Sequence, residues 1–117
     1  MSLLIKKILQ KITVEDLSDK ITNYNTAITY KNLILKRQGH VYFLDAEISQ
    51  SVDWKSGDIL FTIPKDYLAE QSVNCTVTGG ANTRKQDVVI SATNGNVVIG
   101  GDTSNSIWLR IVAVWIR

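Results

Sequence analysis

The sequence contains few of the residues that cross-link small proteins or carry out catalysis. Its 117 residues include one cysteine, one histidine and one proline. A single cysteine cannot form an intrachain disulfide, which excludes a disulfide-stapled scaffold. His40 and Cys75 alone are also too few for a zinc site, which takes three or four His, Cys or carboxylate ligands. We therefore expect no metal and no cofactor.

Long apolar runs and a strong charge imbalance are missing as well. No apolar stretch approaches the roughly 20 residues that a membrane-spanning helix requires. The N-terminal apolar run is interrupted by lysines and lacks the order of a signal peptide. The formal net charge is only +2, and the basic residues are scattered rather than clustered on one segment. We expect a protein made in a cytoplasm, with neither a membrane nor a nucleic-acid partner.

Residues 1–22 have the spacing of a helix. Leu4, Ile8 and Ile12 lie four residues apart, with Ile5 beside them, and together they would form one apolar stripe. Thr13 is a candidate cap for a second short helical turn that continues through Leu17 and Ile21. A helix this short needs a surface to pack on. It either covers the core of its own domain or forms a trimeric stalk through Leu4, Ile5, Ile8 and Ile12.

In residues 23–117, side-chain character alternates with the period of two that is typical of strands. Strands are expected at residues 28–35, 41–48, 59–63, 72–78, 87–93, 97–99 and 107–116. In the second strand, one face is the predicted core: Tyr42, Leu44, Ala46 and Ile48. Asn94-Gly95 predicts a tight type I′ hairpin. The pattern indicates one mainly β domain, an antiparallel β-sandwich with jelly-roll-like character.

The last strand, residues 107–116, is apolar on both faces. Such a strand either lies at the centre of a sandwich or packs against another subunit. The sequence leaves both positions open.

Catalytic motifs are largely absent. Cys75 lies in the middle of a predicted strand, where a cysteine is usually a small packing residue, and no Gly-x-Ser-x-Gly motif occurs. Asp45 and Glu47 share one face of a strand, a spacing that could serve sugar hydrolysis or calcium binding. The simpler interpretation is a solvated strand face. We expect a protein that is not an enzyme, with a small hydrolase as the remaining catalytic alternative.

Surface recognition is then the function that the residues favour. Aromatic rings stack on the apolar C–H faces of sugars, while charged groups hold the hydroxyls. The candidate saccharide-binding residues are Trp54, Tyr67, Trp108, Arg110 and His40. Trp54 lies in a polar loop, where it is either exposed or an anchor that fixes the loop to the core. Trp108 and Arg110 could line a groove or a subunit interface, and His40 could simply be a solvated turn residue.

One segment resembles a known family. Residues 54–67, which read WKSGDILFTIPKDY, are similar to a segment of distal tail and baseplate proteins from phages of Gram-positive bacteria. The later strand–turn–strand pattern around Asn94-Gly95, followed by residues 107–111, fits the same family. The resemblance covers residues 28–117. Many members carry a proline shortly after the aromatic, where this chain has Leu68-Ala69-Glu70.

The resemblance to lactococcal receptor-binding protein heads implies a trimeric β-sandwich module that binds host cell-wall saccharide. It implies a place in the virion, at the tail tip or baseplate, with other tail proteins as partners. Residues 1–22 would then serve trimerisation or docking, and Leu4, Ile5, Ile8 and Ile12 would form the trimer core. The alternative is a structural baseplate module that contacts only other phage proteins. Sugar-binding residues do not carry over, because they lie in variable loops.

Overall fold

The computed structural model describes residues 13–22, 25–51, 54–79, 87–100 and 108–117. Within them the chain forms strands and two short 3₁₀ turns. The strands are β1 (Val14–Asp16), β2 (Ile28–Gln38), β3 (Val41–Gln50), β4 (Ile59–Thr62), β5 (Val73–Asn74), β6 (Thr76–Gly79), β7 (Asp87–Ile90), β8 (Asn96–Gly100) and β9 (Trp108–Ile116). The 3₁₀ turns are η1 (Ser18–Lys20) and η2 (Lys65–Tyr67). The predicted mainly β fold is confirmed.

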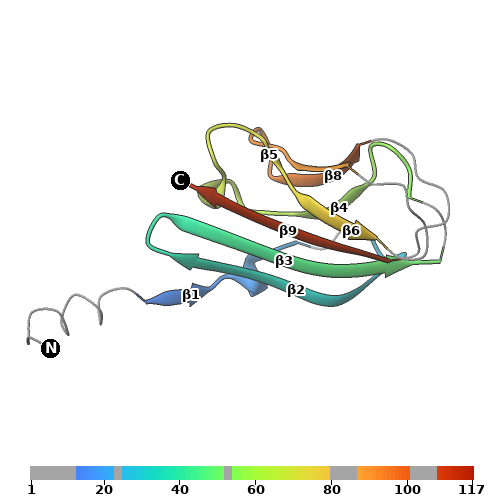
Figure 1. The fold of residues 1–117 in the computed structure, drawn as a ribbon, viewed down its shortest axis with the longest axis horizontal. Coiled ribbons are helices and arrows are strands. Elements are labelled where there is room, and N and C mark those ends of the chain that lie inside the picture. The colour runs from blue at the N-terminus through green and yellow to red at the C-terminus, as the bar shows by residue number, and fades with distance from the viewer. Residues whose placement is uncertain (1–12, 23–24, 52–53, 80–86, 101–107) are drawn as a thin grey trace, which may run out of the picture.

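The strands form two antiparallel sheets that lie face to face (Figure 1). The five-stranded sheet has the order β1-β2-β3-β9-β6, and the four-stranded sheet has the order β4-β8-β7-β5. The last strand therefore lies between β3 and β6, which places it inside its sheet. Two antiparallel layers around one core are the arrangement expected of a β-sandwich.

The core lies between the two sheets and follows the alternation of the sequence. The predicted inward face of β3 is confirmed, since Tyr42, Leu44, Ala46 and Ile48 are all buried. β9 contributes Leu109, Ile111, Ala113 and Trp115, and the second sheet contributes Leu60, Phe61, Val88, Ile90, Val97 and Ile99. The opposite faces of β3 and β9 look outward.

β2 departs from a simple alternation. Its register with β3 shifts between Tyr30 and Asn32, so Lys31 is an extra residue in the strand. After this bulge the inward positions move by one, from Ile28 and Tyr30 to Leu33 and Leu35. A bulge adds one residue to one strand of a pair and re-aims the side chains around it.

The predicted helical turn that begins at Thr13 is wrong. Val14–Asp16 forms strand β1, which pairs with residues 36–38 of β2. Asp16 then accepts hydrogen bonds from the backbone N–H and the hydroxyl of Ser18, which starts the short η1 turn. Leu17 is buried in the core, and Thr22 forms an isolated bridge with Thr62 of β4, so this segment contacts both sheets of the domain. The helix predicted over residues 1–12 lies outside the described residues.

Two other local predictions need correction. The β7–β8 hairpin is confirmed, but its connection runs from Ser91 to Gly95 and is longer than a two-residue turn. Gly95 has φ of 78°, and its N–H donates to the Ser91 carbonyl. The single strand predicted over residues 72–78 is instead two strands, β5 and β6, in different sheets. Cys75 lies at the crossing between them.

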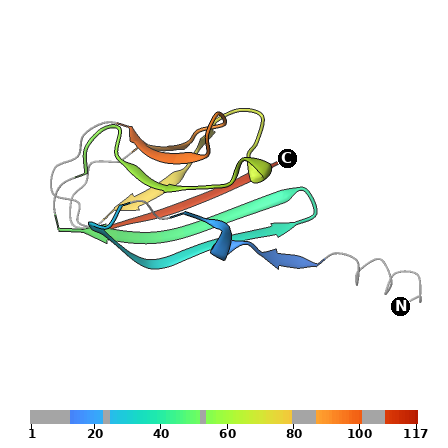
Figure 2. The same ribbon diagram turned by 180° about the vertical axis from the view of Figure 1, so that it is seen from behind.

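The two ends of the molecule are formed by different parts of the strands. β1, the β2–β3 turn and the end of β9 lie together at one end (Figures 1 and 2). The start of β9 pairs with Ser49, near the end of β3, and so lies at the opposite end. The candidate functional residues therefore fall into two groups, one at each end of the molecule.

Candidate functional site

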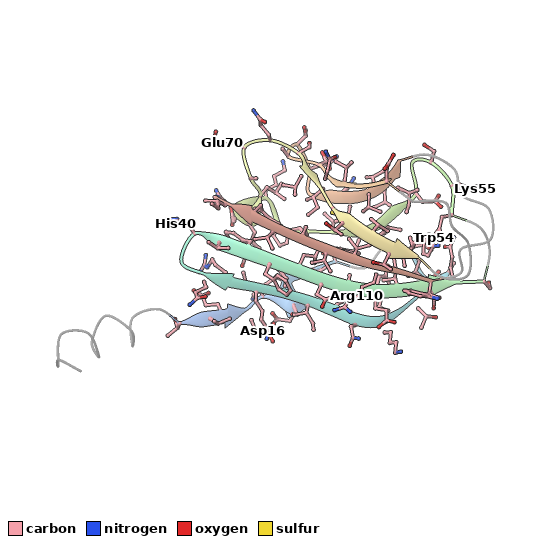
Figure 3. The ribbon with its side chains drawn as sticks, viewed as in Figure 1. Asp16, His40, Trp54, Lys55, Glu70 and Arg110 are labelled. Atoms are coloured by element: carbon pink, nitrogen blue, oxygen red, sulfur yellow. The ribbon has the colours of Figure 1, made fainter. Side chains whose placement is uncertain are left out.

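The predicted site residues do not all lie in one place. Figure 3 places His40 at one end of the molecule and Trp54 at the other, with Arg110 on the outer face of the five-stranded sheet. His40 precedes β3, whereas Trp108 pairs with Ser49 of the same strand. A strand advances about 3.4 Å per residue, so these two positions are separated by roughly 31 Å. One compact site cannot contain both.

Trp54 is an anchor in the core. Its side chain has no exposed surface, and its ring N–H finds no hydrogen-bond partner among the described residues. The loop that follows is fixed to β8: the Gly57 N–H donates to Ile99 O at 2.8 Å, and the Ile99 N–H donates to Asp58 O at 3.0 Å. Because its ring is fully covered, Trp54 offers no stacking face to a sugar. The segment that carries the family resemblance thus has a structural role here.

Tyr67 belongs to an aromatic cluster at the His40 end. Its ring lies 5.8 Å from Tyr42, which in turn stacks on Trp115 with centroids 5.7 Å apart. The Trp115 ring N–H donates to the Tyr67 carbonyl oxygen at 2.7 Å. These contacts tie η2 to β9. His40 is exposed in the β2–β3 turn, where its carbonyl accepts from the Arg117 N–H.

Trp108 and Arg110 are the predicted residues that lie close together. Both are on the outward face of β9, two positions apart, opposite Ser49 and Glu47 of β3. Trp108 keeps 37% of its surface exposed. Arg110 donates two hydrogen bonds to Asp45, at 3.1 and 2.8 Å. This bidentate pair raises the pKa of the Arg110 guanidinium and fixes the guanidinium beside Asp45.

An open cleft of about 650 Å³ lies beside Trp108. One indole ring, two opposite charges and several hydroxyls line it: Thr29, Lys31, Glu47, Ser49, Ser51 and Trp108. Lys31 lies 3.8 Å from Glu47 and is 73% exposed, whereas Glu47 is 29% exposed. The Asn32 amide also donates to Glu47 at 3.4 Å. Ligand clefts typically combine such a volume and apolar surface with a few polar groups.

The β-bulge brings Asn32 to the same side of β2 as Lys31. Uninterrupted alternation would give Lys31 and Asn32 opposite faces of β2, yet Lys31 and Asn32 both contact Glu47. Bulges are common next to functional sites, where they redirect a side chain. No local signal in the sequence announces this one, because the extra residue interrupts no turn motif. Lys31, Thr29 and Ser49 are therefore site residues that the sequence reasoning missed.

Comparison with known proteins assigns the chain to no family. No family model matches the chain, and no curated protein matches it significantly. The resemblance to phage tail heads therefore depends on the residues quoted above. The function has to be argued from the cleft and the surfaces of the molecule.

The acidic residues of the outer face are already engaged. Both oxygens of Asp45 accept from Arg110, and Glu47 contacts Lys31 and Asn32. The described residues hold no cluster of three or more His, Cys, Asp or Glu side chains suited to a metal ion. Burial raises the pKa of the Cys75 thiol to about 12, which keeps it in the weakly nucleophilic protonated form.

The outer face also carries exposed apolar side chains. Val41, Phe43, Val114 and Ile116 face outward at the end of the molecule opposite the cleft. The two-sided apolar pattern of the last strand indicates either a central position or a subunit contact. The strand lies inside its sheet, between β3 and β6, and the end of its outer face is nevertheless apolar. Among the helices of the described residues, none is long and apolar enough to cross a membrane.

Proposed function

We propose that this chain is a saccharide-binding module of a phage tail tip or baseplate that acts as a homotrimer. The observation that supports it best is the cleft beside Trp108. A partly exposed indole ring offers an apolar face to a sugar ring, and Lys31, Glu47 and Ser49 offer donors and acceptors to its hydroxyls. The antiparallel two-sheet fold agrees with the jelly-roll-like heads that the sequence resembles.

The arrangement of the molecule suits attachment at one end and recognition at the other. The cleft lies at one end of the outer face, and both β1 and the end of β9 lie at the other. A module fixed through its terminal end would present the cleft away from its attachment point. Binding, rather than catalysis, is proposed because Asp45 is held by two hydrogen bonds from Arg110.

Binding of purified protein to Gram-positive cell walls, with and without their surface polysaccharide, tests the proposal. We expect saturable binding that disappears with the polysaccharide. Trp108→Ala should weaken this binding at least about tenfold, which corresponds to about 1.4 kcal/mol. Ile59→Ala is the matched control, because Ile59 is 38% exposed, like Trp108, but lies on β4 of the other sheet. Equal binding by wild type and Trp108→Ala would contradict the assignment of the cleft.

The second candidate is a structural baseplate module that contacts only other phage proteins. The exposed apolar residues of β3 and β9 favour it, since monomeric proteins rarely expose contiguous apolar surface without a partner. A folded, trimeric protein that binds none of the cell walls would support this alternative.

A further inference from the structure

The five-stranded sheet has an open edge where β6 stops short of the end of β9. β6 pairs with β9 only from Leu109 to Val112, and its first residue, Thr76, lies opposite Val112. Before Thr76 the chain belongs to the other sheet, as β5 (Figure 1). β9 nevertheless continues to Ile116. Within the described part of the chain, the last residues of β9 are therefore paired on the β3 side alone.

The alternation of backbone hydrogen bonds shows which groups face this open edge. The Arg117 N–H donates to the His40 carbonyl, on the β3 side, at 2.9 Å. In an antiparallel pair every second residue bonds to the same neighbouring strand, and the β3–β9 register has no shift. Trp115 therefore bonds to β3, whereas the N–H and C=O groups of Val114 and Ile116 point to the open side. Among the described residues these groups have no hydrogen-bond partner.

A groove of about 540 Å³ lies along the open edge. The end of β9 forms one wall, and the segment that follows η2 forms the other: Leu68, Ala69, Glu70, Gln71, Ile116 and Arg117. Residues 69–71 belong to no helix or strand. Their backbone N–H and C=O groups make no hydrogen bond to any other described residue. Both walls of the groove thus carry unpaired backbone groups.

The open edge lacks the features that usually keep another strand from pairing. Such features are charged side chains, proline, a bulge or a covering segment. Val114 and Ile116 are apolar and 59% and 70% exposed, and no bulge interrupts the pairing of β9 with β3. The β1 edge of the same sheet differs, because it is only 3 residues long and holds Glu15 and Asp16. The end of β9 is therefore the edge that can accept an added strand.

Unpaired backbone groups on both walls select the kind of occupant. An extended polypeptide presents N–H and C=O groups along both of its edges, so one such segment can pair with both walls. Every described strand of this chain already pairs on at least one edge. A strand from a second copy could therefore satisfy only one wall. Glu70 and Arg117 place one charge of each sign at the groove, which favours a segment without net charge.

We propose that this groove takes up one extended segment of a partner protein, which adds to the five-stranded sheet beside Val114 and Ile116. The segment has apolar side chains at alternate positions, because those on the outer face would form cross-strand pairs with Val114 and Ile116. In strand addition, backbone hydrogen bonds supply the affinity and alternate side chains the specificity. The inference goes beyond saccharide binding and does not depend on it, since the cleft beside Trp108 lies at the other end of β9.

Amide hydrogen exchange of the full chain, measured by NMR, tests this groove. The probe is a short acetylated peptide of alternating valine and threonine, with one lysine and one glutamate at its ends for solubility. Without the peptide, the amides of Val114 and Ile116 should exchange much faster than those of Ala113 and Trp115, which bond to β3. Peptide at roughly ten times its Kd should slow exchange at Val114 and Ile116 about tenfold.

A proline substitution removes one groove-facing donor without touching the bonds to β3. Ile116→Pro should fold, because proline is tolerated in a strand where its N–H would face away from the ladder. It should weaken peptide binding about fivefold, since one hydrogen bond is lost. Ile116→Val is the matched control: it keeps the N–H and a β-branched side chain and should bind like wild type.

A second probe keeps the test decisive if Ile116→Pro does not fold. The same peptide with methyl groups on alternate backbone nitrogens cannot donate to the walls of the groove, and it should not protect Val114 or Ile116 in the wild-type protein. Equal protection by both peptides would overturn the proposal, and so would no protection by either.

The free protein separates the other possible occupants. Slow exchange of the Val114 and Ile116 amides without peptide, independent of protein concentration, would show that another part of this chain fills the groove. Slow exchange that appears only at high protein concentration would show that a second copy fills it. Either result would overturn the partner segment. Saccharide binding through Trp108 is measured independently of all these outcomes.

Discussion

Gly95 is the residue whose local geometry is most constrained. Its φ of 78° lies in the left-handed region, and a Cβ added there would lie 1.9 Å from the carbonyl oxygen of Ile63. The Ile63 N–H in turn donates to the Gly95 carbonyl at 2.9 Å. The β7–β8 connection is thereby held against the chain that leaves β4, and no other residue type fits.

Gly95→Ala should therefore lower the free energy of unfolding more than Gly39→Ala. Gly39 has a similar φ of 61°, but a Cβ added to it would meet nothing within 4 Å. A left-handed non-glycine residue costs about 1–2 kcal/mol, which is the expected loss for Gly39→Ala. Gly95→Ala adds a clash with backbone and should cost clearly more. Urea unfolding of both variants measures the difference, and equal losses would contradict the close approach to Ile63.

Single residues also show which features of the fold a sequence can predict. The inward face of β3 was predictable, because alternation assigns alternate residues to one face of a sheet. The inward face of β9 was not, because both of its faces are apolar in the sequence. The burial of Trp54 was not, since a polar loop can either expose a ring or fix it in the core, and only packing decides. Alternation assigns Asn32 to the wrong face, because the bulge arises from pairing with β3 and has no local signal.

At the level of elements, the segment from Val14 to Ile21 shows local and tertiary preferences in competition. Its apolar spacing fits a helix, and Asp16 followed by Ser18 fits a turn. Pairing with β2 and burial of Leu17 decide the outcome in favour of a strand and a 3₁₀ turn. Isolated short helices are marginally stable, so tertiary contacts readily override them. The change of sheet between β5 and β6 at Cys75 was not predicted, for a related reason. Seven consecutive residues that are suited to a strand need not all remain in one sheet.

The turn after β1 should depend on the ionisation of Asp16. The hydroxyl of Ser18, followed by its N–H, holds the pKa of Asp16 below its ordinary value of 3.8. A lowered folded-state pKa means that the stabilisation is present above the unfolded pKa and is lost as pH falls through the folded one. Carboxyl NMR titration should give a midpoint below 3.8 for wild type and a higher one for Ser18→Ala. An unchanged midpoint would contradict the hydrogen bond.

At the scale of the whole molecule, a cleft and an exposed apolar surface lie at opposite ends of the five-stranded sheet. The sheet carries both on its outer face, while its inner face builds the core. The cleft lies where β9 begins, and the exposed apolar residues Val41, Phe43, Val114 and Ile116 lie where β9 ends. The two surfaces share no residue, so a substitution in one should leave the intrinsic property of the other unchanged.

This separation predicts how binding responds to loss of the trimer. In a trimer, three clefts engage one wall, and each later contact forms at a high effective concentration. A variant that loses the proposed N-terminal trimer contacts, such as Ile8→Asp, should bind a soluble oligosaccharide fragment with the same affinity per site as wild type. Its retention on intact cell walls should fall by about 10²-fold or more. Calorimetry with the fragment and a wall-sedimentation assay measure the two quantities. Trp108→Ala should show the reverse: it remains a trimer and loses affinity in both assays. If Ile8→Asp weakened the per-site affinity as strongly as Trp108→Ala, the trimer contacts and the cleft would not be independent, and the separation of attachment from recognition would have to be abandoned.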